Sequence, residues 1–140
     1  MSPQRKVFAD AFYWVAVSNP TDESHHQALS LTQSLQNSLI ITTEEVLTEV
    51  LAYFSGRGQR FRRRAAQTVR HLLTDPRVRV VPQSHESFLA GLELYEARLD
   101  KGYSLTDCIS MNTMSAEGIT DILTNDVHFT QEGFRALFRA

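Results

Sequence analysis

Short apolar runs alternate along this chain with longer segments whose apolar residues recur at helical spacing. Four runs have the length and composition of buried strands, at residues 7–9, 39–41, 78–81 and 119–124. Strands separated by helices predict a parallel sheet with both faces covered, which is an α/β fold. We expect a single domain over residues 1–140, because a chain of this length with 42% hydrophobic residues can bury one core.

Residues typical of helix ends divide the segments between these strands. The pattern Thr42-x-x-Glu45 predicts a capping box that opens a helix, and Ser104 is expected to begin another that Gly118 ends. The second of these is expected over 105–117, and further helices are expected over 11–17, 22–39, 59–74 and 84–99. After these come a turn at 126–129 and a terminal segment, 133–138, to which the residues assign no element.

Asp10 interrupts an apolar run that otherwise extends from residue 7 to residue 17. An unpaired buried carboxylate costs several kcal/mol unless it is protonated or compensated, so a functional role is one interpretation. The other is an N-cap for the helix that follows, and the sequence leaves both open.

Glu49 falls at the edge of the apolar face of its predicted helix, whereas Glu45 points nearly opposite that face. Glu44 and Glu45 lie in the first turn, where the helix dipole already accounts for an acid. Glu49 is too far into the helix for that account, and a solvated flank position is its alternative.

Asp107 and Asp126 each follow a predicted boundary. Asp107 comes three residues after Ser104 and could simply belong to a helix start. Asp126 comes just past the last predicted strand and could be a cap. In a parallel sheet, however, the carboxyl ends of the strands border one crevice where ligands bind. We therefore expect Asp10, Glu49, Asp107 and Asp126 to converge there.

Carboxylates gathered in one crevice repel each other unless protons or a divalent cation neutralise them. Oxygen-only ligands favour Mg²⁺ or Mn²⁺ over zinc. The sequence has no His-x-x-x-His pair, which is the spacing typical of a zinc hydrolase. Such a site suits phosphoryl chemistry, in which a metal activates water and stabilises the leaving oxygen.

The order of these segments resembles the PIN-domain family, including VapC-type toxins. The segments that carry the resemblance are Val7-Phe8-Ala9-Asp10, Thr42-Thr43 leading to Glu49-Val50-Leu51, Tyr103-Ser104-Leu105-Thr106-Asp107, and Ile122-Leu123-Thr124-Asn125-Asp126-Val127-His128-Phe129. The last two in combination are the most specific, and the likeness spans nearly the whole chain. It implies a PIN-like three-layer α/β/α fold with a central, mostly parallel sheet of four to five strands.

The resemblance also implies an activity. Asp10, Glu49, Asp107 and Asp126 would hold Mg²⁺ or Mn²⁺, and metal-activated water would cleave single-stranded RNA, or RNA in a structured loop, to leave a 5′-phosphate and a 3′-hydroxyl. Thr124 and Asn125 would support the acids. A toxin of a toxin–antitoxin pair, a homodimer and an antitoxin protein partner are implied in the same way.

One position departs from the family pattern, because Ala11 stands where Thr or Ser commonly follows the first acid. The alternative function is accordingly a weakly active or inactive PIN-fold module that binds RNA or protein, although intact acids at all four positions favour an enzyme. A flap-type DNA nuclease would be expected to carry long insertions, for which 140 residues leave no room.

The net charge of −2 gives no overall sign of nucleic-acid binding, so the charge signal is local. Eight of the twelve arginines fall between residues 57 and 79. RNA contact, an acidic antitoxin segment and a solvated helix face are all compatible with this excess. The arginines that we expect to contact RNA are Arg57, Arg60, Arg62, Arg63 and Arg64.

The lone cysteine, Cys108, cannot form an internal disulfide, and no run approaches the roughly 20 apolar residues that span a bilayer. We expect a cytoplasmic protein with no membrane partner.

Overall fold

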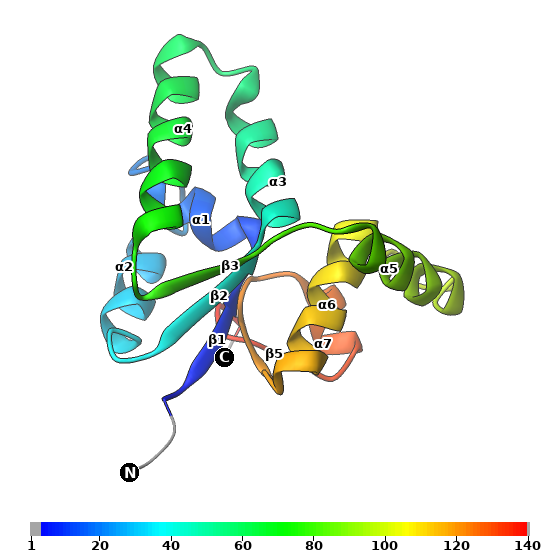
Figure 1. Ribbon diagram of the computed structural model, residues 1–140. Helices are drawn as coiled ribbons and strands as arrows, with labels where there is room; N and C mark the ends of the chain where they lie inside the picture. The colour runs from blue at the N-terminus through cyan, green and yellow to red at the C-terminus, as the bar shows by residue number, and fades with distance from the viewer. Residues whose placement is uncertain (1–3, 140) are drawn as a thin grey trace.

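The computed structural model describes residues 4–139. Five parallel strands form a sheet in the order β3-β2-β1-β4-β5, flanked by helices (Figure 1). The strands are β1 (Lys6–Ala9), β2 (Leu39–Thr43), β3 (Val78–Val81), β4 (Asp121–Leu123) and β5 (Arg135–Ala136). The predicted α/β/α fold with a central parallel sheet is confirmed.

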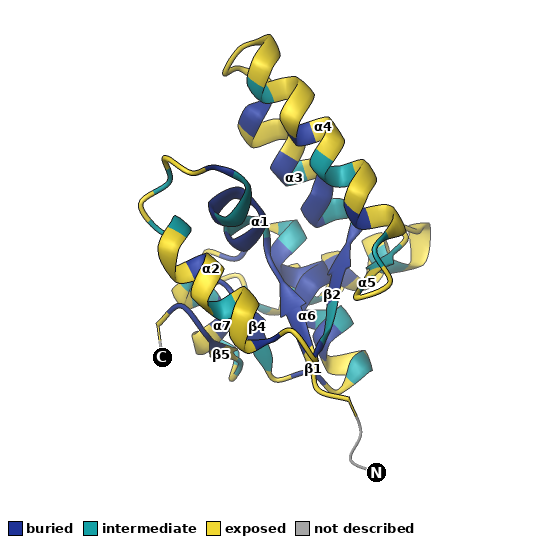
Figure 2. Cartoon of the chain, turned by 90° about the vertical axis from the view of Figure 1, so that its left-hand side faces the viewer, coloured by how far each residue is buried: buried dark blue, intermediate teal, exposed yellow. Residues whose placement is uncertain are grey.

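Helices lie on both sides of this sheet. They are α1 (Ala11–Ser18), α2 (His25–Ser34), α3 (Glu44–Ser55), α4 (Gln59–Thr74), α5 (His85–Ala97), α6 (Leu105–Glu117) and α7 (Val127–Gln131). Figure 2 shows α1, α2 and α4 in front of the sheet and α6 and α7 behind it. The α3–α4 hairpin extends beyond the sheet, and α5 projects to the side, where it packs on α6 (Figure 1).

The strand order reverses between β1 and β4, at the centre of the sheet. From β1 the chain moves outward through β2 to β3, then crosses back to β4 and moves outward again to β5. In parallel sheets the crevice outside the carboxyl ends of the strands opens at such a reversal. β1 anchors this point, because Val7, Phe8 and Ala9 are fully buried.

The helix after β2 begins one residue later than the capping-box pattern predicts, so that prediction is wrong in detail. Thr43 is the N-cap, and its hydroxyl accepts a hydrogen bond from the backbone N–H of Val46 at 3.1 Å. Thr42 belongs to β2, where its buried hydroxyl donates to the carbonyl of Ala9 at 2.8 Å. Thr42 therefore joins two strands instead of starting a helix.

Three other segments differ from their predicted bounds. The helix expected over 22–39 is confined to His25–Ser34, because Asp22 forms a turn with Ser24 before it and only Ala28 of the helix is buried. The strand expected over 119–124 is shorter, since the N–H of Ile119 closes the end of α6. The turn at 126–129 becomes the five-residue helix α7.

The terminal segment supplies a short edge strand, β5, which pairs in parallel with β4. Residues 59–74 and 105–117 form helices with the predicted bounds, and Gly118 ends α6 with the left-handed backbone that glycine favours (φ 70°). Within residues 4–139, no helix combines the length and apolar character needed to cross a bilayer.

Candidate active site

Each of the four predicted acids lies where its element meets the carboxyl edge of the sheet. Asp10 directly follows β1, and Asp126 follows β4 by three residues, so both stand at the reversal of strand order. Asp107 lies in the first turn of α6 and Glu49 in the second turn of α3. Two crossover helices thus bring their acids to the end of the central strands.

A buried threonine joins the two acids that follow the strands. The Thr124 hydroxyl donates to Oδ2 of Asp10 at 2.9 Å and accepts a hydrogen bond from the backbone N–H of Asp126 at 3.2 Å. Thr124 is fully buried and Asp10 is 7% exposed. Asp10 occupies the N-cap position of α1, but its side chain makes no capping hydrogen bond. Its carboxylate is therefore directed toward Thr124 and the cluster.

Asp107 and Asp126 do act as caps, as the simpler interpretation of each held. Oδ2 of Asp107 accepts from the N–H of Ser104 at 3.0 Å, and Oδ1 of Asp126 accepts from the N–H of His128 at 2.9 Å. Each carboxylate has two oxygens with several lone pairs, so capping leaves acceptor capacity for a ligand.

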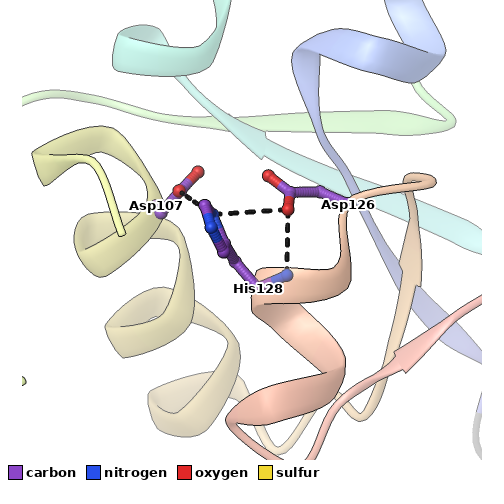
Figure 3. Close-up of side chains that lie close together, drawn as sticks. All are labelled: Asp107, Asp126 and His128. Atoms are coloured by element: carbon purple, nitrogen blue, oxygen red, sulfur yellow. Dashed lines mark hydrogen bonds and ion pairs between the residues drawn. The ribbon is translucent and has the colours of Figure 1, made fainter. Parts of the chain in front are cut away.

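His128 lies between these two carboxylates (Figure 3). Its Nδ1 is 3.4 Å from Oδ2 of Asp107 and 3.3 Å from Oδ1 of Asp126. Asp107, Asp126 and His128 each offer a ligand atom, and these atoms all lie within 4.8 Å of one another. Asp10 and Glu49 lie outside this closest group.

Glu49 is half-buried and its charge is coupled to the other three acids. Burial, followed by the charges of Asp10, Asp107 and Asp126, raises the pKa of Glu49 to about 7. Glu44 and Glu45 are directed elsewhere, because their carboxylates accept from the backbone of Gln83 and the hydroxyl of Ser87. Of the three glutamates in the first half of α3, Glu49 is the one that faces the cluster.

The same causes act on two of the aspartates. Burial raises the pKa of Asp10 to about 6, although the hydrogen bond from Thr124 opposes it. Burial and the charge of Asp126 also raise the pKa of Asp107, against the hydrogen bonds from Ser104 and His128. Within residues 4–139, no lysine or arginine forms an ion pair with any of the four acids. The cluster is a concentrated negative charge that a cation would neutralise.

The sequence favoured packing over phosphate contact for His128, which lies near the predicted site. Its ring packs edge-on against Tyr103 with centroids 5.5 Å apart, and Gly102 passes so close that an added Cβ would lie 3.2 Å from Nε2. Tyr103 in turn donates to Glu132, which Arg98 binds with two hydrogen bonds. The spacing Asp126-x-His128 indicated that these two residues lie side by side, because an Asp at an N-cap hydrogen-bonds to the second residue of its helix.

Among the described residues, neither Asn125 nor the arginines expected to contact RNA form a hydrogen bond or ion pair with any of the four acids. Asn125 is exposed, and its oxygens accept hydrogen bonds from Arg139. Its supporting role stays a prediction. The five arginines expected to contact RNA are all exposed, around the turn between α3 and α4 and in the first turns of α4. Arg60, Arg63 and Arg64 make no side-chain hydrogen bond or ion pair with the described part of the chain.

Comparison with known proteins agrees with the fold. The model of the PIN domain family matches residues 7–134. The chain is similar to VapC20 of Mycobacterium tuberculosis, a toxin that cleaves the sarcin–ricin loop, with 25% identity and a TM-score of 0.81 over 91% of this chain and 95% of that one. It also resembles a chain of VapBC2 from Rickettsia felis, solved bound to a DNA fragment from their promoter, with 19% identity and a TM-score of 0.64 over 94% and 96%. No curated protein matches the chain significantly.

Proposed function

The chain belongs to the PIN domain family, and from that premise we propose that it is an endoribonuclease that depends on Mg²⁺ or Mn²⁺. Its substrate is single-stranded RNA or an RNA loop, and its products carry a 5′-phosphate and a 3′-hydroxyl. The observation that carries the proposal is the convergence of Asp10, Glu49, Asp107 and Asp126 at the reversal of strand order. Burial raises the pKa of the first three, and the four acids have no basic partner among residues 4–139 except His128.

The donor set fits a hard divalent cation. The four acids offer only oxygen, and carboxylates suit Mg²⁺ and Mn²⁺. When bound, the ion would supply charge neutralisation at the phosphate and a lowered pKa for water. We assign the four acids as its ligands. Imidazole suits softer metals, so His128 is a positioning residue that fixes the carboxylates of Asp107 and Asp126, as Thr124 fixes Asp10.

Labelled RNA tests the proposal directly. The purified chain is incubated with a single-stranded RNA and an RNA hairpin loop in Mg²⁺, in Mn²⁺ and in EDTA, and the product ends are identified. The variant is Asp107→Asn, whose amide oxygen can still accept the Ser104 N–H, so α6 keeps its cap. We expect more than about a 100-fold loss, because even the partners of metal ligands are worth about 10- to 100-fold.

The matched control is Asp100→Asn, since the Asp100 side chain is 77% exposed. It should cleave like the wild type. Equal cleavage by the wild type and Asp107→Asn, or cleavage that persists in EDTA, contradicts the assignment of the acids.

A binding module without turnover is the second candidate. Ala11 favours it, because this residue lies at the first turn of α1 beside Asp10 and brings no hydroxyl to the cluster. RNA binding without cleavage in any divalent metal, by both the wild type and Ala11→Ser, would support this candidate. A gain of cleavage in Ala11→Ser would show instead that the missing hydroxyl limits the enzyme.

We also propose that the chain is the cytoplasmic toxin of a toxin–antitoxin pair, bound by an antitoxin protein and paired as a homodimer. An exposed apolar stripe along α5 supports the dimer. Its side chains on the helix, Phe88, Leu92 and Tyr95, recur at helical spacing and are between 38% and 46% exposed, and Leu99 in the turn that follows α5 is 80% exposed. Light scattering tests this, because Leu92→Glu should give a monomer where the wild type is a dimer. A wild type that is monomeric at all concentrations contradicts it.

A further inference from the structure

A pocket of about 520 Å³ opens between α1 and α3 beside the four acids. Glu49 belongs both to its wall and to the acid cluster, and Ala11 of the wall directly follows Asp10. The rest of its lining is mostly apolar and includes the rings of Phe12 and Tyr53. The pocket is therefore an apolar, aromatic space adjoining a concentrated negative charge.

One face of α3 leads from the acids past this pocket. Glu49 and Tyr53 are four residues apart on α3, which places them on one face with about 6 Å of rise between them, and Arg57 lies in the turn that follows the helix. Tyr53 is 42% exposed. The guanidinium of Arg57 lies 4.1 Å from the centroid of the Tyr53 ring, and its Nε donates to the Tyr53 carbonyl at 3.1 Å. A strand that extends from the acids along α3 would meet an aromatic ring and then a cation.

That order matches the chemistry of single-stranded nucleic acid. Proteins bind single strands by stacking bases on aromatic side chains and by placing arginines along the backbone. A nucleobase has apolar faces that suit the walls formed by Ala11 and Phe12, and polar edges that suit the carboxylate of Asp22 at the rim. Lipid chains and apolar peptides would gain nothing from Asp22 and Glu49, whose charges they would have to desolvate.

We propose that this pocket receives the nucleobase adjacent to the scissile phosphate, which stacks on Tyr53, while Arg57 binds the next phosphate along the strand. The proposal rests on the RNA cleavage proposed above and adds where the substrate strand runs. It assigns Tyr53 and Arg57 to substrate binding, and it gives the α3 face a function distinct from that of the exposed arginines of α4.

An abasic substrate tests the stacking. The RNA carries an abasic nucleotide next to the mapped cleavage position, and the variants are Tyr53→Ala and Tyr53→Phe. Removing either the base or the ring should weaken RNA binding by about 5- to 150-fold, as expected for one stacked base. Removing both should weaken it no further. Tyr53→Phe keeps the ring and should bind like the wild type.

Arg57→Gln separates charge from stacking. It should weaken binding to all sequences and lower the slope of log affinity against log salt by about 1, whereas Tyr53→Ala should leave that slope unchanged. Circular dichroism checks that each variant is folded. If removing the ring and removing the base each weaken binding and the two losses multiply when Tyr53→Ala binds the abasic RNA, the proposal is wrong. A Tyr53→Ala variant that binds RNA like the wild type would also overturn it.

Binding is measured with Asp107→Asn present in every protein, so that no substrate is consumed. The stacking proposal can then fail while the wild type still cleaves RNA. In a chain that binds RNA without cleaving it, the abasic nucleotide is moved along the strand instead, and the coupling to Tyr53 should appear at one position.

Discussion

Asp10 should make the metal-free protein less stable as the pH rises. Burial raises the pKa of Asp10 from its ordinary 3.8 to about 6, so the folded protein holds this proton more tightly than the unfolded chain does. The resulting stabilisation is fully present below about pH 4 and is lost as the pH passes through about 6. The difference in pKa corresponds to about 3 kcal/mol of the free energy of unfolding.

Replacing Asp10 by asparagine removes this penalty. The amide oxygen of asparagine can still accept the hydrogen bond from Thr124, so the buried hydroxyl keeps its partner. In EDTA at about pH 8, the free energy of unfolding of Asp10→Asn should therefore exceed that of the wild type by up to about 3 kcal/mol. The two free energies should converge near pH 4. Urea unfolding at several pH values measures both differences, with Asp100→Asn as the exposed control.

Adding Mg²⁺ or Mn²⁺ should make the wild type more stable than Asp10→Asn. A ligand that binds the folded state stabilises it in proportion to the logarithm of its concentration over the dissociation constant, and the wild type retains all four carboxylates. A stability difference between wild type and Asp10→Asn that does not change with pH would refute the electrostatic reasoning. Equal stabilisation of both proteins by the metal would refute Asp10 as a ligand.

Three further predictions concern the neighbours of this carboxylate. Thr124→Val should lower the free energy of unfolding by about 1–3 kcal/mol and raise the pKa of Asp10 further, because it removes a buried donor. Denaturation measures the first effect and NMR titration the second. The pKa of Glu49, about 7 in the wild type, should fall in metal-free Asp10→Asn, since one of the charges that raise it is gone; carboxyl NMR tests this. Gly102→Ala should displace His128, because its Cβ would lie 3.2 Å from Nε2, and should lower RNA cleavage several-fold, on the order of 10-fold, without unfolding the chain.

The control for the glycine variant is Gly56→Ala, because nothing lies within 4 Å of a Cβ at that position and its φ of −95° suits alanine. It should cleave RNA like the wild type. An unchanged Gly102→Ala variant would mean that the position of His128 does not matter. A Thr124→Val variant as stable as the wild type would contradict the bridging role of its hydroxyl.

The sequence predicted the helices and strands best where local signals agree. Residues 59–74 and 105–117 have a clear boundary at each end, and Ser104 and Gly118 act as the caps that their types suggest. Predictions failed where tertiary contacts use the same groups differently. Thr42 had a plausible partner in Glu45, but its hydroxyl bonds to the carbonyl of Ala9 in the neighbouring strand, which no local pattern reveals.

The candidate site divides in the same way. That an acid follows β1 and another follows β4 is visible in the sequence, and so is the position of Glu49 on the edge of its helix. Their proximity depends on the reversal of strand order between β1 and β4, which is set by pairings between segments more than 100 residues apart. The same pairing places Thr124 against Asp10. The role of His128 and the pocket beside Glu49 appear only once these elements pack together.

The sequence by itself thus determined which residues carry charge, where the chain alternates between strand and helix, and which family the pattern resembles. These are properties of residue type and local spacing. The tertiary structure decided which carboxylates meet, how far burial raises the pKa values of Asp10 and Glu49, and that the guanidinium of Arg57 lies over the ring of Tyr53 beyond Glu49. Those properties depend on desolvation and on distances between remote segments, and only the packed sheet and helices set them.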